Sequence, residues 1–107
     1  MVEIGVEELK RRQDEGEKIH LLDVREDEEL RICRLPGAEH IPMLYLFAGL
    51  KEPAAPKEAE LVVVCHHGLR SLDAARFLRM SGWSRARSLS GGIDAWAANY
   101  DPAMARY

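Results

Sequence analysis

Hydrophobic and polar positions along the chain define two alternating kinds of segment. Segments of strand length lie at 19–24 (IHLLDV), 61–65 (LVVVC) and 86–90 (ARSLS). Helices are predicted over 6–16, 26–33, 71–82 and 91–100, with a shorter one at 43–50. The run at 61–65 has no polar alternation, which is typical of a strand buried on both faces. The pattern therefore predicts a chain in which strands and helices take turns.

Such an alternation favours a parallel sheet that is covered by helices on both faces. Prolines and glycines mark a turn at 36–42 (PGAEHIP), which leads into a short extended piece, and an exposed connector at 51–60. In sheets of this kind, ligands bind at the carboxyl ends of the strands. Cys65 lies at the carboxyl end of the most apolar strand, which is where ligands bind in this architecture.

Composition and charge narrow the class of protein. The 107 residues suffice for one domain, 1–107, and are too few for two. The net charge of −3 argues against nucleic acid or an anionic membrane as the main partner, because both require a basic face. No apolar run can span a bilayer, and the first residues do not resemble a signal peptide. Because the only cysteines are Cys33 and Cys65, we expect a reducing, cytoplasmic setting without a disulfide framework or a metal site.

The segment from Cys65 to Ser71 (CHHGLRS) carries the candidate chemistry. A loop between a buried strand and a helix points backbone N–H groups inward, and the positive end of the helix adds to their effect. Gly68 permits a backbone conformation that a side chain would forbid, and Ser71 is predicted to be the N-cap of the following helix. Such a loop favours thiolate over thiol, and the thiolate is the nucleophilic form. Arg70 adds a permanent positive charge.

A second interpretation makes Cys65 a small buried hydrophobic residue at the end of its strand. The two histidines, the glycine and the arginine that follow are not expected in a buried strand. The sequence therefore favours a reactive cysteine. His66 and His67 would attract an anion when protonated, whereas as exposed loop residues they would supply only polarity. No zinc site is expected from Cys65, His66 and His67, because their spacing fits no common zinc motif.

Four segments of this chain resemble motifs of the rhodanese family of sulfurtransferases and occur in the same order along the sequence. The loop CHHGLRS is similar to the family's active-site loop C-x-x-G-x-R-[ST]. The segments LLDVRE at 21–26, LPGAEHIP at 35–42 and LSGGIDAW at 89–96 are similar to the family's second strand end, its I-P-G-A turn and the start of its last helix. The resemblance covers nearly the whole chain. It implies a single rhodanese-like domain: a three-layer α/β/α fold around a central, mainly parallel five-stranded sheet.

The resemblance also implies a reaction and its residues. Cys65 would attack the outer sulfur of a small anionic donor such as thiosulfate, or of a protein persulfide, and pass the sulfur on to cyanide or a thiol. Arg70 would hold the anionic donor. Asp23 and Arg25 match the family's D-x-R and would brace the neighbouring loops, with Arg25 a minor candidate for attracting the donor. No metal or organic cofactor is implied. The substrate-binding loop would comprise His66, His67, Gly68, Leu69, Arg70 and Ser71.

Two other functions share this fold. In cell-cycle phosphatases and arsenate reductases, the loop from cysteine to arginine resembles the pattern C-x5-R. That loop is wide enough for a tetrahedral oxyanion. Cys65 to Arg70 is C-x4-R, and the shorter loop suits a single sulfur atom better. The remaining alternative is a non-catalytic or redox-sensing rhodanese-like binding module. A purely structural module would not need the cysteine, whereas a redox sensor would also retain it.

Three further expectations concern particular positions of the chain. Cys33 and Arg34 stand where the family usually has Gly-His, and we expect Cys33 to close its helix at the sheet edge opposite Cys65. Arg25 and Glu29 are spaced to form an i, i+4 ion pair. The glycines at 91 and 92 are expected to let the last loop pass close to the cysteine loop.

Overall fold

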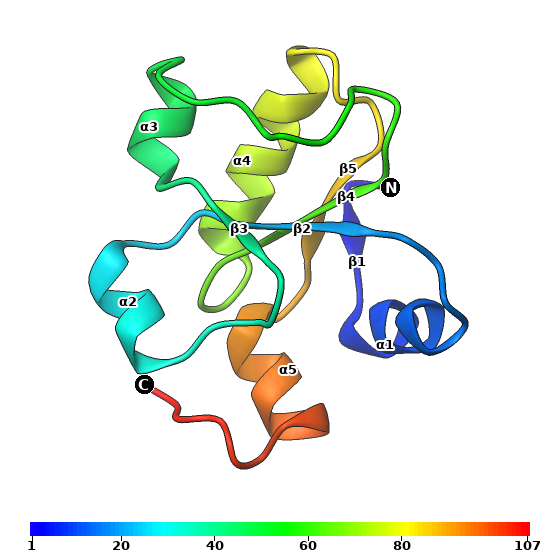
Figure 1. Ribbon diagram of the computed structural model, residues 1–107, viewed down its shortest axis with the longest axis vertical. Helices are drawn as coiled ribbons and strands as arrows, with labels where there is room; N and C mark the ends of the chain where they lie inside the picture. The colour runs from blue at the N-terminus through cyan, green and yellow to red at the C-terminus, as the bar shows by residue number, and fades with distance from the viewer.

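The structure is a computed structural model that describes residues 1–107. Its centre is a sheet of five parallel strands in the order β1-β5-β4-β2-β3. Strand β4 is the central strand and lies between β5 and β2 (Figure 1). Its carboxyl end therefore lies in the middle of the row formed by the carboxyl ends of the five parallel strands. The strands are β1 (Glu3–Ile4), β2 (His20–Asp23), β3 (Glu39–His40), β4 (Leu61–Val64) and β5 (Ala86–Leu89).

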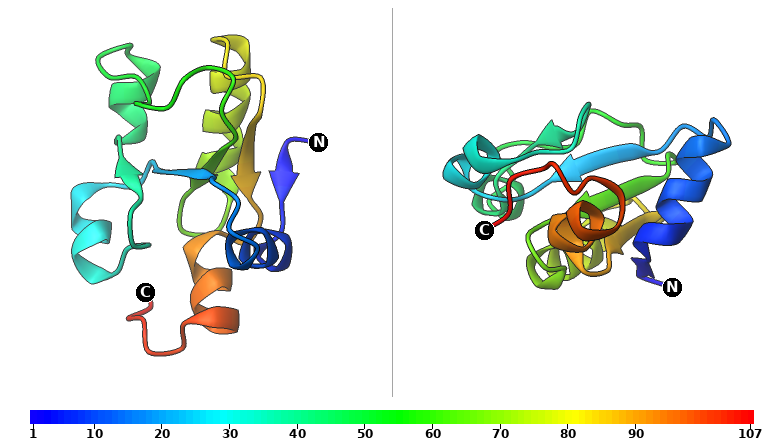
Figure 2. Two further views of the ribbon diagram at one scale, coloured as in Figure 1. Left: turned by 45° about the vertical axis from the view of Figure 1, so that its right-hand side comes forward. Right: turned by 90° about the horizontal axis from the view of Figure 1, so that it is seen from below.

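Helices cover both faces of this sheet. Helices α1 and α5 pack against each other on one face, and α3 and α4 pack against each other on the other face (Figure 2). None of the five helices combines the length and the apolar composition needed to cross a membrane. The helices are α1 (Val6–Asp14), α2 (Asp27–Ile32), α3 (Met43–Phe47), α4 (Leu69–Met80) and α5 (Gly92–Tyr100). The predicted three-layer fold with a five-stranded parallel sheet is confirmed.

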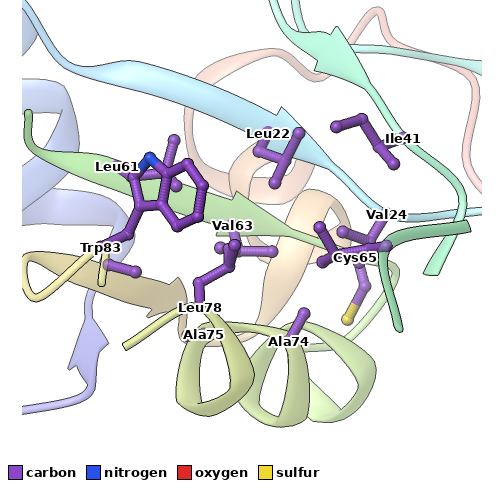
Figure 3. Close-up of a cluster of buried hydrophobic side chains, with 12 residues drawn as sticks. Leu22, Val24, Ile41, Leu61, Val63, Cys65, Ala74, Ala75, Leu78 and Trp83 are labelled. Atoms are coloured by element: carbon purple, nitrogen blue, oxygen red, sulfur yellow. The ribbon is translucent and has the colours of Figure 1, made fainter. Parts of the chain in front are cut away.

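The side chains of β4 alternate between two hydrophobic clusters, because successive residues of a strand point to opposite faces. Val62 and Val64 belong to the cluster under α1 and α5. Leu61, Val63 and Cys65 belong to the cluster under α3 and α4 (Figure 3). The period of two therefore sends the Cys65 side chain toward α4. Its sulfur lies at the end of the strand, beside the first turn of that helix.

Two local details differ from the pattern-based prediction. Strand β1 consists of only Glu3 and Ile4, which pair with Ser88 and Leu89 of β5, and two residues are too few to show a periodicity. Helix α4 begins at Leu69, with Gly68 as its N-cap. The prediction that Ser71 caps this helix is therefore wrong. Ser71 lies in the first turn of α4.

Candidate active site

The Cys65 thiol lies inside a cradle of backbone amides. Its Sγ accepts hydrogen bonds from the N–H of Gly68 at 3.1 Å and from the N–H of Ser71 at 3.3 Å. Only 1% of Cys65 is exposed. Both amides belong to the turn that starts α4, so the positive end of the helix dipole faces the sulfur. The structure therefore places backbone N–H donors around the sulfur, as the loop pattern predicts.

Gly68 makes the turn geometrically possible. Its φ of 104° lies in the left-handed region, where side chains are rarely found. A Cβ at this position would also lie 3.1 Å from the Gly91 nitrogen and 3.2 Å from the Leu89 oxygen. The loop after β4 therefore passes close to the loop after β5. A residue with a side chain would push the two loops apart and move the amides away from Cys65.

The start of α5 holds the cysteine loop from the other side. The N–H of Ile93 donates to the Cys65 carbonyl at 2.9 Å, and the N–H of Asp94 donates to the His66 carbonyl at 3.1 Å. A Cβ on Gly92 would overlap both carbonyl groups, and Gly92 has a φ of 63°. The expected close passage of Gly91 and Gly92 is confirmed. Because the two carbonyls point toward α5, the N–H groups of the following turn are free to face the sulfur.

Two buried hydroxyl groups support the loop beneath the sulfur. The Ser71 Oγ lies 3.3 Å from the Cys65 Sγ and 2.7 Å from the Oγ of Ser88 in β5. The Ser88 Oγ also donates to the Gly68 carbonyl at 3.4 Å. A hydroxyl can either accept from a thiol or donate to a thiolate. Ser71 can therefore add a third hydrogen bond to the sulfur when the proton leaves.

Arg70 is held by a carboxylate from α2. Its guanidinium donates to both Glu29 oxygens, at 2.7 Å each. The predicted Arg25–Glu29 ion pair is wrong, because Arg25 reaches only the backbone carbonyl of Glu29, at 3.4 Å. The hydrogen bonds from Arg70 outweigh burial and lower the pKa of Glu29 to about 2. The Glu29 carboxylate is therefore charged throughout the neutral range.

Asp23 and Arg25 form a buried brace at the end of β2. The Arg25 side chain is completely buried, and it donates to both Asp23 oxygens, with its Nη2 2.7 Å from Oδ2. The same Nη2 donates to the Cys33 carbonyl at 2.8 Å, which ties the end of α2 to the strand. Although burial opposes its charge, the hydrogen bonds to Asp23 raise the pKa of Arg25. The buried guanidinium thus ties the end of β2 to the end of α2, which is the geometry of a brace. Its attraction of a donor stays a prediction.

The segment after α5 returns to the cysteine loop. The views in Figures 1 and 2 both show the chain running from α5 back toward α2. The Tyr107 ring stacks on the His66 ring, with centroids 3.7 Å apart and 8° between the planes. The Tyr107 hydroxyl accepts from Arg25 at 2.9 Å and donates to Glu29 at 2.8 Å. Burial is the main reason that the pKa of Tyr107 rises to about 12. Tyr107 thus joins the brace, the Glu29 carboxylate and the loop.

The other loop side chains have different surroundings. The Nε2 of His66 is buried without a hydrogen-bond partner. The Nδ1 of His67 lies 3.9 Å from Asp94, which also pairs with Arg106 at 3.0 Å. Leu69 is 78% exposed although it is apolar. Of the predicted loop residues, Gly68 and Ser71 contact the Cys65 sulfur, whereas His67 and Leu69 are exposed. The roles of the loop side chains in binding a substrate stay a prediction.

Cys33 does not lie at the opposite edge of the sheet, so that prediction is wrong. Its Sγ lies 3.9 Å from the Nη1 of Arg25, and it lines a small hollow with His66 and Tyr107. The reason is the length of α2: six residues span only about 9 Å, too little to carry the chain back across the sheet. Both cysteines are free thiols. No group of three or more potential metal ligands is gathered anywhere in the structure.

Sequence reasoning missed four residues of this site. Glu29 was assigned to the wrong arginine, and Tyr107 lies in a segment without a motif. Asp94 was hidden inside the last helix. Ser88 left one signal, a hydroxyl side chain in the middle of a strand that is otherwise expected to be buried. The contacts of all four depend on segments distant in the sequence.

Comparisons with known proteins agree with this geometry. The model of the rhodanese-like domain matches residues 5–99. The chain is 34% identical over 103 residues to a sulfurtransferase of Allochromatium vinosum, covering 96% of this chain and 94% of that protein. It is 36% identical over 100 residues to the probable adenylyltransferase/sulfurtransferase MoeZ of Mycobacterium tuberculosis, covering 94% of this chain. It spans only 26% of the length of MoeZ.

A solved structure is similar over almost its full length. The human single-domain sulfurtransferase TSTD1 matches with a TM-score of 0.81 and 31% sequence identity, covering 92% of this chain and 97% of that one. The family match includes β4, the cysteine loop and the start of α5, which together build the amide cradle. The chain therefore belongs to the rhodanese-like domain family, several of whose members are named sulfurtransferases.

Proposed function

We propose that this chain is a sulfurtransferase that carries a sulfane sulfur as a persulfide on Cys65. In the first half-reaction, the Cys65 thiolate attacks the outer sulfur of a donor such as thiosulfate. The S–S bond of the donor breaks, its electron pair leaves with sulfite, and a Cys65 persulfide anion remains. In the second half-reaction, cyanide or a thiol attacks the outer sulfur of that persulfide and restores the thiolate. The two steps balance without an external oxidant or reductant.

The single observation that carries this proposal is the pair of amide hydrogen bonds to the Cys65 Sγ, at 3.1 and 3.3 Å. They stabilise the nucleophilic thiolate before the attack. They remain available to the inner sulfur of the persulfide afterwards. The same donors therefore serve both states of the cycle.

The rest of the loop has supporting roles in the proposal. Gly68 and Ser71 supply the amides, whereas His66, His67, Leu69 and Arg70 form the rim that an arriving donor meets. Asp23 and Arg25 brace the end of β2 beneath this rim. The partners are a small anionic sulfur donor and a thiol or cyanide acceptor. A protein persulfide is a further proposed donor, which is supported by the similarity of the chain to the putative sulfur carrier protein YrkF of Bacillus subtilis.

The other functions of this fold receive less support. Four residues separate Cys65 from Arg70, which is one fewer than in the phosphatase and arsenate reductase pattern. Arg70 is also engaged by Glu29, so it does not close a ring of donors around an oxyanion. A redox-sensing module would keep the cysteine, but it would not form a persulfide from thiosulfate.

Intact-protein mass spectrometry after incubation with thiosulfate tests the proposal. The wild-type chain is expected to gain the mass of one sulfur atom and to lose it again when cyanide is added. Cys65→Ser is expected to show no gain, whereas Cys33→Ser serves as the matched control and should behave like wild type. A wild-type protein that gains no sulfur from any sulfane-sulfur donor would contradict the proposal and favour the redox sensor.

A further inference from the structure

The three arginines in the network around the cysteine loop are all neutralised. Each guanidinium is paired with one carboxylate, in the pairs Arg25–Asp23, Arg70–Glu29 and Arg106–Asp94. Only Arg70 belongs to the loop itself. The permanent positive charges around the thiol are thus balanced one by one. A site that is built to attract a doubly negative donor would be expected to keep at least one of these charges unpaired.

Glu29 is held more firmly than an ordinary surface carboxylate. Both of its oxygens accept from Arg70 at 2.7 Å. In addition, Oε1 accepts from the Tyr107 hydroxyl at 2.8 Å, and Oε2 accepts from the N–H of Glu26 at 2.8 Å. Each oxygen therefore has two donors, and the carboxylate cannot turn away from Arg70 without losing them. Tyr107 lies outside the residues 5–99 that match the family model, so this hold on Glu29 includes a contact made by a segment beyond that match.

Arg70 lies in the first turn of α4, directly before Ser71, whose N–H donates to the Cys65 sulfur at 3.3 Å. The hydrogen bonds to Glu29 are the main reason that the pKa of Arg70 is raised. Arg70 is also partly exposed, with 36% of its side chain accessible. An arriving donor would therefore meet this guanidinium, with the Glu29 carboxylate directly behind it.

We infer that Glu29 is a positioning residue that sets donor specificity by neutralising Arg70. The inference rests on the proposed sulfur transfer at Cys65. It assigns the site to sulfane-sulfur donors with a single negative charge, such as thiosulfonates and small persulfides, in preference to the thiosulfate dianion. Glu29 acts through Arg70 and does not touch the donor.

The effect of removing the Glu29 charge depends on the charge of the donor. The energy of a donor in the field of the loop is proportional to the donor's charge. If one negative charge is removed behind Arg70, the factor gained by a dianion is therefore the square of the factor gained by a monoanion. An improvement of about tenfold for the dianion corresponds to about threefold for the monoanion. This relation separates a charge effect from a general change in activity.

Thiosulfate and methanethiosulfonate form a matched pair of donors for the test. Both carry a transferable outer sulfur on a sulfonyl group, with charges of two and one. Their leaving groups are sulfite and methanesulfinate, and both reactions leave the same Cys65 persulfide. We propose to measure kcat and KM for both donors in Glu29→Gln, with cyanide as the acceptor. Glutamine keeps the shape and the hydrogen bond to the N–H of Glu26 but removes the charge.

For Glu29→Gln we expect kcat/KM to rise about tenfold with thiosulfate and about threefold with methanethiosulfonate, mainly through KM. The gain with thiosulfate should shrink at high salt, because a freed surface charge is screened. An unchanged ratio of the two donors would overturn the inference. A fall with thiosulfate would also overturn it, because Glu29 would then be holding Arg70 in the orientation that binds the donor.

Two control variants separate charge from structure. Glu28→Gln removes the same charge from an exposed position of the same helix and should leave the donor ratio unchanged. Tyr107→Phe removes one hydrogen bond from Glu29 but keeps its charge, and the ratio should again stay near wild type. If Tyr107→Phe shifted the ratio as much as Glu29→Gln, loosening would explain the effect and the inference would fail.

The test also distinguishes this inference from the proposed function. If the wild-type protein transfers sulfur from neither donor, sulfur transfer itself is contradicted. If it uses both donors and the ratio does not respond to Glu29→Gln, only the role of Glu29 is contradicted.

Discussion

The two ends of the sheet carry similar networks of arginines and carboxylates, but only one end surrounds a reactive atom. At the amino ends of β4 and β5, Arg12 and Arg85 share the Glu60 carboxylate. At the carboxyl ends, Arg25 is bound by Asp23 and Arg70 by Glu29, around the Cys65 thiol. Ion pairs alone therefore do not identify the site.

The two ends differ in burial and in backbone geometry. Arg25 and Asp23 are buried to 0% and 1% exposure, whereas more than half of the Arg85 side chain is exposed. The carboxyl end also has backbone amides directed at one atom, Cys65 Sγ. The comparison shows that the rigid backbone around a buried thiol marks the site, while the charges tune it.

The largest effect is expected from Gly92→Ala. The left-handed φ of 63° costs about 1 kcal/mol for alanine, and the new methyl group would overlap the Cys65 and His66 carbonyls. We expect a loss of about 3 kcal/mol or more in the free energy of unfolding, with loss of persulfide formation. Urea unfolding measures the first and intact mass the second.

Gly16→Ala is the matched control for this substitution. Gly16 has a φ of 81°, but a Cβ there would meet nothing within 4 Å. It should therefore cost only the strain of the left-handed backbone, about 1 kcal/mol, and leave persulfide formation intact. Equal losses in the two variants would mean that the close approach of α5 to the loop is unimportant.

The next effect comes from breaking one ion pair at each end. Asp23→Asn leaves the fully buried Arg25 without its charge partner, and we expect a loss of about 3 kcal/mol in the free energy of unfolding. Glu60→Gln weakens a less buried network, in which the side chains of Arg12, Glu60 and Arg85 are 11%, 20% and 56% exposed, and its loss should be smaller, about 1 kcal/mol. Urea unfolding of both variants at neutral pH is the measurement. A similar loss in both would contradict the difference in burial.

A smaller effect is expected from hydroxyl groups. Ser88→Ala removes the partner of the buried Ser71 hydroxyl, at a cost of about 1 kcal/mol, and should slow persulfide formation. Ser81→Ala at the other end of α4 removes an exposed bond to the Phe77 carbonyl and should change stability by less than about 0.5 kcal/mol. Thermal unfolding and the rate of mass gain would be compared. A normal rate in Ser88→Ala would exclude Ser88 from supporting the loop.

The last prediction concerns acid. The pKa of Glu29 lies at about 2 in the folded protein, against an ordinary value of 4.5. A depressed carboxyl pKa stabilises the fold above the ordinary value, and this contribution is lost as the pH falls from about 4.5 to about 2. Glu29→Gln should therefore lose less stability than wild type between pH 5 and 3, by urea unfolding at each pH. Glu28→Gln should follow wild type, and a parallel pH dependence in all three proteins would contradict the assignment.

The amide cradle could be predicted from the sequence because its causes are local. An apolar strand, a cysteine, a glycine and a helix follow one another between Leu61 and Met80. A loop that leads from this strand into α4 through Gly68 directs its N–H groups toward the strand end, and Cys65 directly follows Val64, the last residue of that strand. The all-parallel sheet followed in the same way from the alternation of segments. Only β1, which is two residues long, left no pattern.

The electrostatics of the site could not be predicted, because they depend on distant partners. Glu29 is four residues from Arg25 but 41 from Arg70, and only the folded chain decides between them. Tyr107 reaches Glu29 across 78 residues. The error over Cys33 had a different cause: α2 was assumed to cross the sheet, but a single short helix leaves its end beside Arg25. Spacing rules work within an element and fail between elements.

The clamp between α5 and the cysteine loop has a consequence for the order of folding. Cys65 and its strand lie in the middle of the chain, but the amides that hold the loop carbonyls belong to Ile93 and Asp94. A chain synthesised only as far as β5 has the thiol and lacks the clamp. Domains generally fold as units, so we expect the cysteine loop to stay unclamped until α5 is made. Local unfolding of α5 would release the same two carbonyls.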